Sequence, residues 1–239
     1  MRGIKHPVAT GGRPRAFALS VAVTALLLGG CDPAARTAGQ LLNPTVASLQ
    51  EIKGLHTDGN FAAVVDRQVS CMPAQEGCAQ LHYLKADSCR RVAGAAGPGR
   101  RGRLDCAIEN YEAALVAVGQ RADPLVDRRA VEIALLDMSV QRRDAAEGAA
   151  DAAAQNAALQ RRAAAAQRGP SARPAGFYHA AEALMSDVVR AGTSGNCARI
   201  DEAARLLAEA RADGTPYAAP AQRLASSIES TRRARGCAA

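Results

Sequence analysis

The sequence predicts an all-α protein built as an array of antiparallel helix pairs. Ala dominates the composition, Trp is absent, and the chain holds only three Phe and four Tyr. Ala loses the least on entering a helix, whereas strands favour the β-branched and aromatic residues that are scarce here. Apolar residues recur in steps of three and four, and no segment alternates apolar and polar residues as a half-buried strand does.

Four helices are predicted in the first half of the chain. Asp58-Gly59 is a turn dipeptide that ends the first helix, and Asn60 is a suitable N-cap for the second. The stretch 94–102 contains Pro98 and several glycines, which predicts a non-helical loop. The fourth helix carries an apolar stripe about 100° wide and is expected to pack firmly on one side. The predicted helices span residues 45–57, 60–70, 75–93 and 103–120.

Four further helices are predicted in the second half. Asp123-Pro124 is typical of a helix start. Between residues 141 and 168 the only large apolar residue is Leu159, so this stretch is expected to be a solvent-exposed, partly frayed helical extension or linker. The predicted helices span residues 125–140, 176–191, 197–212 and 219–235. The predicted segments are N-terminal helical repeats (45–140), an Ala/Arg-rich helical extension or linker (141–175) and C-terminal helical hairpins (176–239).

The N-terminus has the parts of an export signal. Basic residues precede an apolar stretch, 16–28, which is shorter than the ~20 residues that a membrane-spanning helix needs. The stretch ends in Leu28-Gly29-Gly30-Cys31, which resembles the lipobox of bacterial lipoproteins. The resemblance implies a signal peptide at 1–30, a lipid on the thiol of Cys31 and a tether at 31–44. An ordinary secretory signal is the alternative. The basic residues are Arg2, Lys5, Arg13 and Arg15.

Export sets the expected compartment and charge. Removing the signal lowers the net charge from +7 to +3, too small a surplus to indicate a nucleic-acid partner. The expected location is a cell membrane, with the protein held through its lipid and facing the periplasm. Asp32 resembles the enterobacterial signal for retention in the inner membrane, but other lineages use different positions, so the choice of membrane stays open.

With Cys31 assigned to the lipid, six cysteines remain in an oxidising compartment, where disulfides are expected. In an antiparallel hairpin the end of one helix lies beside the start of the next. The helix layout therefore predicts the pairs Cys71-Cys78, Cys89-Cys106 and Cys197-Cys237. A zinc or redox site is the alternative, but it needs spacings such as Cys-x2-Cys, which do not occur here, so no metal is expected.

Two of the predicted helices share a spacing. Segment 107–114 places Ala, Tyr and Ala at its first, fifth and eighth positions, and segment 203–210 places Ala, Leu and Ala there. This spacing resembles the second helix of a tetratricopeptide repeat. The resemblance implies stacked helix pairs with a groove for a peptide or protein. The first-helix pattern is only approached at Leu81 and Leu84, and the loop 94–102 is too long for such a repeat. An ordinary antiparallel bundle is the alternative.

The sequence contains no recognisable catalytic constellation. The histidines of the exported part are isolated, no serine lies in a GxSxG setting, and Gly97–Gly102 lacks the order of a phosphate loop. We therefore expect a membrane-anchored, non-catalytic adaptor or scaffold in envelope assembly, secretion or transport, without a cofactor and with a periplasmic or membrane protein as partner. The alternatives are a small-ligand-binding lipoprotein of a transport system and an unrecognised envelope enzyme. Possible partner contacts are Arg100, Arg101, Arg103 and Tyr111.

Overall fold

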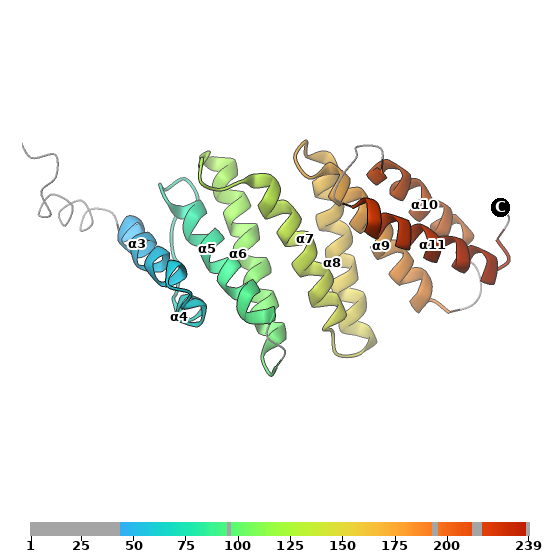
Figure 1. The fold of residues 1–239 in the computed structure, drawn as a ribbon, viewed down its shortest axis with the longest axis horizontal. Coiled ribbons are helices and arrows are strands. Elements are labelled where there is room, and N and C mark those ends of the chain that lie inside the picture. Colours follow the sequence, from blue (N-terminus) through green and yellow to red (C-terminus); the bar gives the residue numbers. More distant parts are fainter. Residues whose placement is uncertain (1–43, 95–96, 193–195, 212–216, 238–239) are drawn as a thin grey trace, which may run out of the picture. The chain divides into compact units, whose positions relative to one another are not determined.

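The fold is all-α, as predicted. The computed structural model describes residues 44–94, 97–192, 196–211 and 217–237, and it contains no strand within them. Residues 44–239 form one compact unit. None of the described helices is long and apolar enough to cross a membrane. The helices are α3 (Pro44–Thr57), α4 (Phe61–Asp66), α5 (Cys78–Gly94), α6 (Arg100–Gln120), α7 (Arg128–Asp144), α8 (Gly148–Arg168), α9 (Arg173–Arg190), α10 (Cys197–Arg211) and α11 (Ala218–Ala234) (Figure 1).

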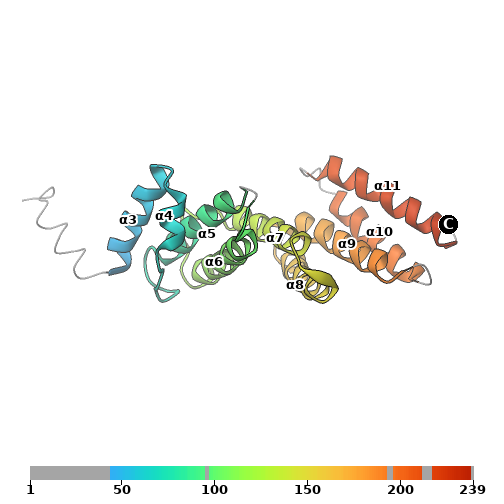
Figure 2. The ribbon, with the colours of Figure 1, turned by 90° about the horizontal axis from the view of Figure 1, so that it is seen from below.

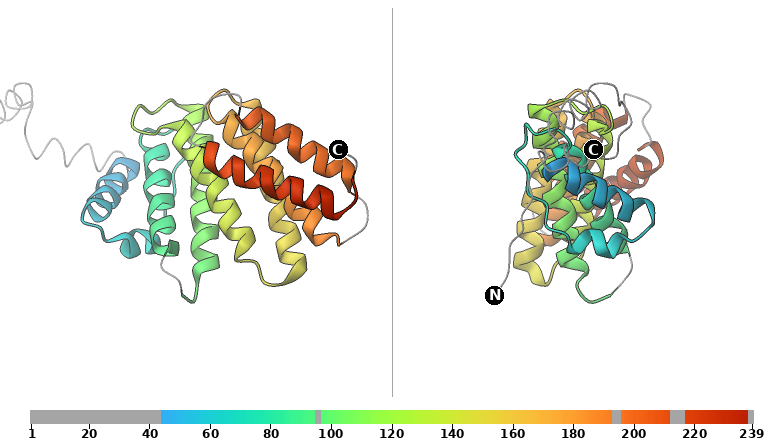
Figure 3. Two further views of the ribbon diagram at one scale, coloured as in Figure 1. Left: turned by 45° about the vertical axis from the view of Figure 1, so that its right-hand side comes forward. Right: turned by 90° about the vertical axis from the view of Figure 1, so that its left-hand side faces the viewer.

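The helices from α4 to α11 pack mainly on their neighbours in the chain, which confirms the predicted array of antiparallel helices. Alternate helices also touch, since α3 packs on α5, α7 on α9 and α9 on α11. Figure 2 shows α6 and α8 toward one edge of the ribbon and α11 toward the opposite edge. Figure 3 shows α10 and α11 running side by side, in agreement with their packing.

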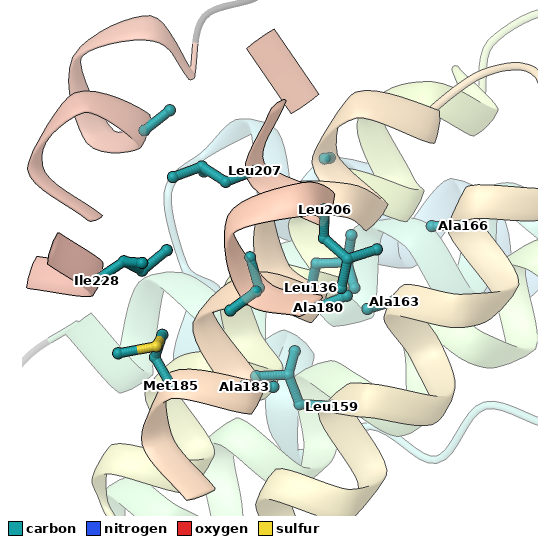
Figure 4. Packing of buried hydrophobic residues seen from close by; sticks show 14 of the residues in the cluster. Leu136, Leu159, Ala163, Ala166, Ala180, Ala183, Met185, Leu206, Leu207 and Ile228 are labelled. Carbon is teal, nitrogen blue, oxygen red and sulfur yellow. The ribbon is translucent and has the colours of Figure 1, made fainter. Parts of the chain in front are cut away.

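The buried side chains form three clusters along this array. The first is small and joins Ile52, Val64 and Leu81 from α3, α4 and α5. A second cluster fills the space between α5, α6 and α7, and a third runs from α7 to α11. Figure 4 shows Leu159 of α8 among the buried residues of α7, α9 and α10 in the third cluster. Alanine is the commonest residue in these clusters, so the helices approach one another closely.

The three predicted disulfides are confirmed. Their Cα atoms lie 5.7, 6.0 and 5.6 Å apart, in the order of the chain, within the usual range for a disulfide. The first closes the loop between α4 and α5, the second joins α5 to α6, and the third ties the start of α10 to the residue beyond α11. The bonds are Cys71–Cys78, Cys89–Cys106 and Cys197–Cys237.

Helix boundaries in the first half differ from the prediction. The second helix ends at Asp66 rather than at Ser70, because the backbone at Arg67 is extended (φ −76°, ψ 133°) and leads into the loop closed by the first disulfide. The prediction that all of 94–102 lies outside a helix is wrong at both ends, because α5 includes Gly94 and α6 begins at Arg100. Gly99 has φ +84°, which glycine adopts without strain, and α6 starts directly after it.

The start of α7 was also predicted too early. Asp123 does not cap this helix, because a turn and not a helix follows it at residues 124–126. Its carboxylate accepts hydrogen bonds from the backbone N–H of Leu125 (3.0 Å) and from Nε2 of Gln80 (2.9 Å). Asp127 is the N-cap, and its side chain accepts from the backbone N–H of Arg129 at 2.9 Å.

The expectation of an exposed, frayed segment after residue 140 is wrong. Residues 148–168 form α8, which packs on α7 and α9 and buries Leu159 completely. Asn156 is also buried, and its Nδ2 donates to the carbonyl of Ala183 and to Asp187 on α9. Gly176 of α9 brings the two backbones together, since a Cβ there would lie 2.8 Å from the carbonyl oxygen of Ala163. Small residues therefore create an interface that large apolar residues do not mark.

Candidate functional site

The best candidate site is a cleft of about 460 Å³, named here the tyrosine cleft. Arg90 from α5 contributes to its lining, while α7, α9 and the start of α11 supply the other side chains. All these elements are odd-numbered helices, so their alternation in the array places residues that are distant in the sequence in one cleft. The lining residues are Arg90, Ala134, Asp137, Met138, Val140, Gln141, Tyr178, His179, Glu182, Tyr217, Pro220 and Arg223.

His179 lies at the base of the cleft and is 4 % exposed. Its Nδ1 is 3.1 Å from Oε2 of Glu182, and its Nε2 is 3.4 Å from Oδ1 of Asp137. Nε2 is buried without a hydrogen bond of acceptable geometry. Burial lowers the pKa of His179, but hydrogen bonding and charge from Asp137 and Glu182 outweigh it, so the pKa is raised. The imidazole therefore lies between two carboxylates that favour its protonated form.

Glu182 connects this histidine to a buried arginine. Its Oε1 accepts a hydrogen bond from Nη2 of Arg143 at 3.0 Å, and the Arg143 side chain is only 9 % exposed. Burial raises the pKa of Glu182, but the hydrogen bond from His179 and the charge of Arg143 lower it by more, and the net direction is downward. Glu182 is thus kept ionised, whereas a general acid needs a raised pKa. The contacts among His179, Glu182 and Arg143 hold these side chains in place and favour their charged forms.

Two tyrosines form the aromatic wall of the cleft. Tyr178 and Tyr217 are stacked, with ring centroids 5.0 Å apart and planes at 29°. The His179 ring meets both edge-on, with centroids 5.0 and 5.8 Å away. Burial raises the pKa of Tyr217 to about 12, so its phenol stays protonated at neutral pH. The wall therefore offers a rigid apolar surface with neutral hydroxyl groups.

Charged side chains lie at the rim. Arg90 pairs with Asp87, its Nη2 lying 2.5 Å from Oδ1, so part of its charge is already compensated. Arg223 is exposed, and no ion pair joins it to another residue of the described part of the chain. Asp137 is 51 % exposed and can accept further hydrogen bonds. The cleft thus combines aromatic contact with groups that bind polar and charged atoms of a ligand.

The residues that the sequence indicated for partner contact do not line this cleft. Tyr111 is 1 % exposed and packs beside Tyr83 in the core, so its prediction as a contact residue is wrong. It fills the inner face of α6, as the large residue of a packed helix stripe does. Arg100 is exposed, Arg101 pairs with Glu147, and Arg103 is half-buried. Cys31 lies outside the described residues.

A second cluster carries metal-ligand chemistry. One sulfur from each of Cys71 and Cys78 and a ring nitrogen of His82 all lie within 4.8 Å of one another. The two sulfurs form a disulfide in this structure. The prediction that each histidine is isolated from possible metal ligands is wrong for His82, because Cys78 and His82 are four residues apart, on one face of α5.

The tyrosine cleft was also missed by sequence reasoning. The sequence carries one signal for it: Phe177-Tyr178-His179 places three rings in a row, in a chain that has few aromatic residues. The sequence gives no sign that Tyr217 stacks on Tyr178 or that Asp137 lies beside His179, because both contacts depend on the packing of α7, α9 and α11.

Comparison of the chain with protein-family models, with curated proteins and with solved structures found no match.

Proposed function

We propose that this protein is an exported lipoprotein that acts as a non-catalytic protein-binding adaptor. The tyrosine cleft is the proposed binding site for a segment of the partner protein. The observation that carries the proposal is the joint lining of this cleft by α5, α7, α9 and α11, with a stacked tyrosine pair at its wall. Repeated helix pairs that line one surface are a common way to bind an extended segment.

The chemistry of the cleft favours recognition. Tyr178 and Tyr217 hold each other in place, so contact with a partner costs little side-chain entropy. Their hydroxyl groups, the amide of Gln141 and the guanidinium of Arg223 supply hydrogen bonds to a partner backbone or side chain. His179 is already bound by two carboxylates, which favours a positioning role for it over proton transfer.

The packing of alternate helices supports the resemblance to tetratricopeptide repeats. In such repeats the first helices of successive pairs stack on one another, and α3 on α5 and α7 on α9 follow this order. The pair α5 and α7 departs from it, because these two helices do not pack closely. We therefore propose a repeat-like array of helix pairs whose odd-numbered helices bind the partner.

The three disulfides support a location outside the cytoplasm, since such bonds persist in oxidising compartments. We propose a membrane anchor through a lipid on Cys31. Mass spectrometry of the protein from membranes is expected to find a diacylglycerol-type mass increment on Cys31. Cys31→Ser is expected to release the protein from the membrane fraction, and an unmodified Cys31 thiol would contradict the anchor.

Photocrosslinking in intact cells tests the adaptor function. A benzophenone amino acid at Gln141 faces the cleft, whereas the same group at Val116, which is 55 % exposed on α6, is the matched control. Crosslinks to one protein from position 141 only, lost in Tyr178→Ala/Tyr217→Ala, support the proposal. Equal crosslinks from both positions contradict it.

The volume of the cleft also favours a second candidate function, the binding of a small ligand. About 460 Å³ lies within the range of roughly 300–1,000 Å³ that is typical of ligand pockets. Native mass spectrometry of the protein purified from cells distinguishes the two functions. A small molecule that remains bound to wild type, but not to Tyr178→Ala/Tyr217→Ala, would replace the adaptor function with this one.

A further inference from the structure

We propose that Cys71, Cys78 and His82 form a Zn²⁺ site when the disulfide between the two cysteines is reduced. Two thiolates and one imidazole are ligands that zinc prefers, and three protein ligands leave a fourth position open. The three ligand atoms already lie within 4.8 Å of one another. Cys78 and His82 are one helical turn apart on α5, and Cys71 approaches them from the preceding loop.

The histidine is held by a hydrogen bond at its Nδ1. The amide of Asn110 donates through Nδ2 to the carbonyl of Cys106 at 2.9 Å, which leaves Oδ1 as an acceptor. Nδ1 of His82 lies 2.9 Å from this Oδ1, so Nδ1 carries the proton and donates it. The lone pair is thereby placed on Nε2. A ligating histidine is commonly held in this way, through a hydrogen bond from its other nitrogen to an oxygen acceptor.

The loop that carries Cys71 is held by more than the disulfide. Oε1 of Gln75 accepts from the backbone N–H of Met72 (2.8 Å) and from Oγ1 of Thr45 (3.1 Å). The backbone N–H of Gln75 donates to the carbonyl of Met72 at 2.8 Å. These bonds do not depend on sulfur, so Cys71 is expected to stay beside Cys78 after reduction. Cys71 is half-buried and Cys78 is 1 % exposed, so a cation enters past Cys71.

The chemical steps balance with a dithiol as reductant. Exchange breaks the Cys71–Cys78 bond, gives each sulfur one electron and one proton from the dithiol, and converts the dithiol to its own disulfide. Zn²⁺ then displaces the two thiol protons and binds both sulfurs, while the neutral imidazole of His82 contributes its lone pair. A small disulfide reverses the step: it takes two electrons from the two thiolates and two protons from solvent, becomes a dithiol, and leaves the Cys71–Cys78 bond re-formed and Zn²⁺ released. The site therefore alternates between a disulfide and a zinc complex.

The experiment maps thiol protection in the full chain after reduction. Zn²⁺ is added to the reduced protein, thiols are alkylated, and each cysteine is quantified by mass spectrometry. We expect zinc to slow alkylation of Cys71 and Cys78 and to leave Cys89 and Cys106 unaffected. Titration with Co²⁺ as a spectroscopic probe is expected to give tetrahedral thiolate bands that Zn²⁺ removes, and the oxidised protein is expected to give none.

Variants separate a built site from binding by loose thiols. His82→Gln is expected to weaken Co²⁺ binding more than about 10-fold, and Asn110→Leu by about 10–100-fold. Asn110→Asp keeps an acceptor for His82 and is expected to bind like wild type. His56→Gln, on α3, is the control histidine. Equal protection of all cysteines by zinc, or no protection of any, would overturn the proposal. Unchanged Co²⁺ binding in His82→Gln would also overturn it. These outcomes count against the proposal even if reduction unfolds the chain.

Discussion

The three disulfides are expected to contribute unequally to the free energy of unfolding, and the contribution is expected to increase with the length of the loop that each closes. Each is removed by a double Cys→Ala variant. A disulfide stabilises the fold mainly because it restricts the unfolded chain, and the effect grows with the logarithm of the loop length. The bonded residues are 7, 17 and 40 positions apart in the chain. Cys197–Cys237 therefore closes the longest loop and Cys71–Cys78 the shortest.

The chain-entropy relation converts these separations into free energies. At 25 °C, the lost stability is about 2.4 kcal/mol for Cys71–Cys78, about 3.1 kcal/mol for Cys89–Cys106 and about 3.9 kcal/mol for Cys197–Cys237. The first two variants form the matched comparison, because each pair has one buried and one half-buried sulfur. Their packing losses are thus similar, and the difference of about 0.8 kcal/mol isolates the loop length.

Urea unfolding at 25 °C, followed by circular dichroism and by tyrosine fluorescence, measures these losses. Coincident transitions by both signals establish that a single free energy of unfolding applies, which an array of helix pairs does not guarantee. The reasoning is refuted if the Cys71/Cys78 variant loses as much stability as the Cys89/Cys106 variant, or more. Such a result would mean that native packing, rather than the unfolded chain, sets the effect.

Three further predictions concern packing and charge. Gly176→Ala is expected to lower the free energy of unfolding by about 1–3 kcal/mol, because its Cβ would meet the α8 backbone. Gly54→Ala has open space around its Cβ and is expected to raise the free energy of unfolding by about 0.5–1 kcal/mol. Urea titration compares the two variants. Burial raises the pKa of Asp87, but hydrogen bonds from Arg91, Arg90 and His56 lower it to about 2 from 3.8. About 2 kcal/mol of stability is therefore expected to disappear as the pH falls from about 4 to about 2, and Asp87→Asn is expected to lack this step in acid unfolding. Stability is expected to fall as the pH rises above 6.5 through the raised pKa of His179, and His179→Gln is expected to remove that loss in unfolding curves measured across this range.

The fold class, the helix order and the disulfide pairs could be predicted because they depend on local signals. The wide apolar stripe of α6 and the turn at Asp58-Gly59 are encoded within a few residues. The disulfide pairing followed from the antiparallel layout alone. Local signals failed where a tertiary contact competed with them. Asp123 looked like a helix cap, but its carboxylate binds Gln80 on another helix.

The burial of α8 shows why large apolar residues are an incomplete guide. Leu159 is flanked at helical spacing by Asn156 and Ala163, and all three are completely buried. Alanine buries little area by itself, but it lets helices approach closely enough for backbone and neighbouring side chains to make contact. Gly176 on α9 completes this close approach. A stripe that includes small residues and one polar residue would have predicted the buried face.

The charge of His179 decides how the tyrosine cleft responds to pH. Its pKa is raised by Asp137 on α7 and Glu182 on α9 despite burial, so its contribution to stability is complete below pH 6.5 and is lost as the pH rises through the raised value. Glu182 behaves oppositely, since its lowered pKa makes its contribution complete above pH 4.5 and lost as the pH falls. Between these limits the imidazolium offsets one of the two carboxylates, and Arg143 lies beside Glu182. Above the pKa of His179, the base of the cleft loses one positive charge, and a partner that bears a carboxylate there is expected to bind more weakly. NMR titration of the His179 ring measures the pKa directly, and a value at or below 6.5 would remove the physical basis of both effects.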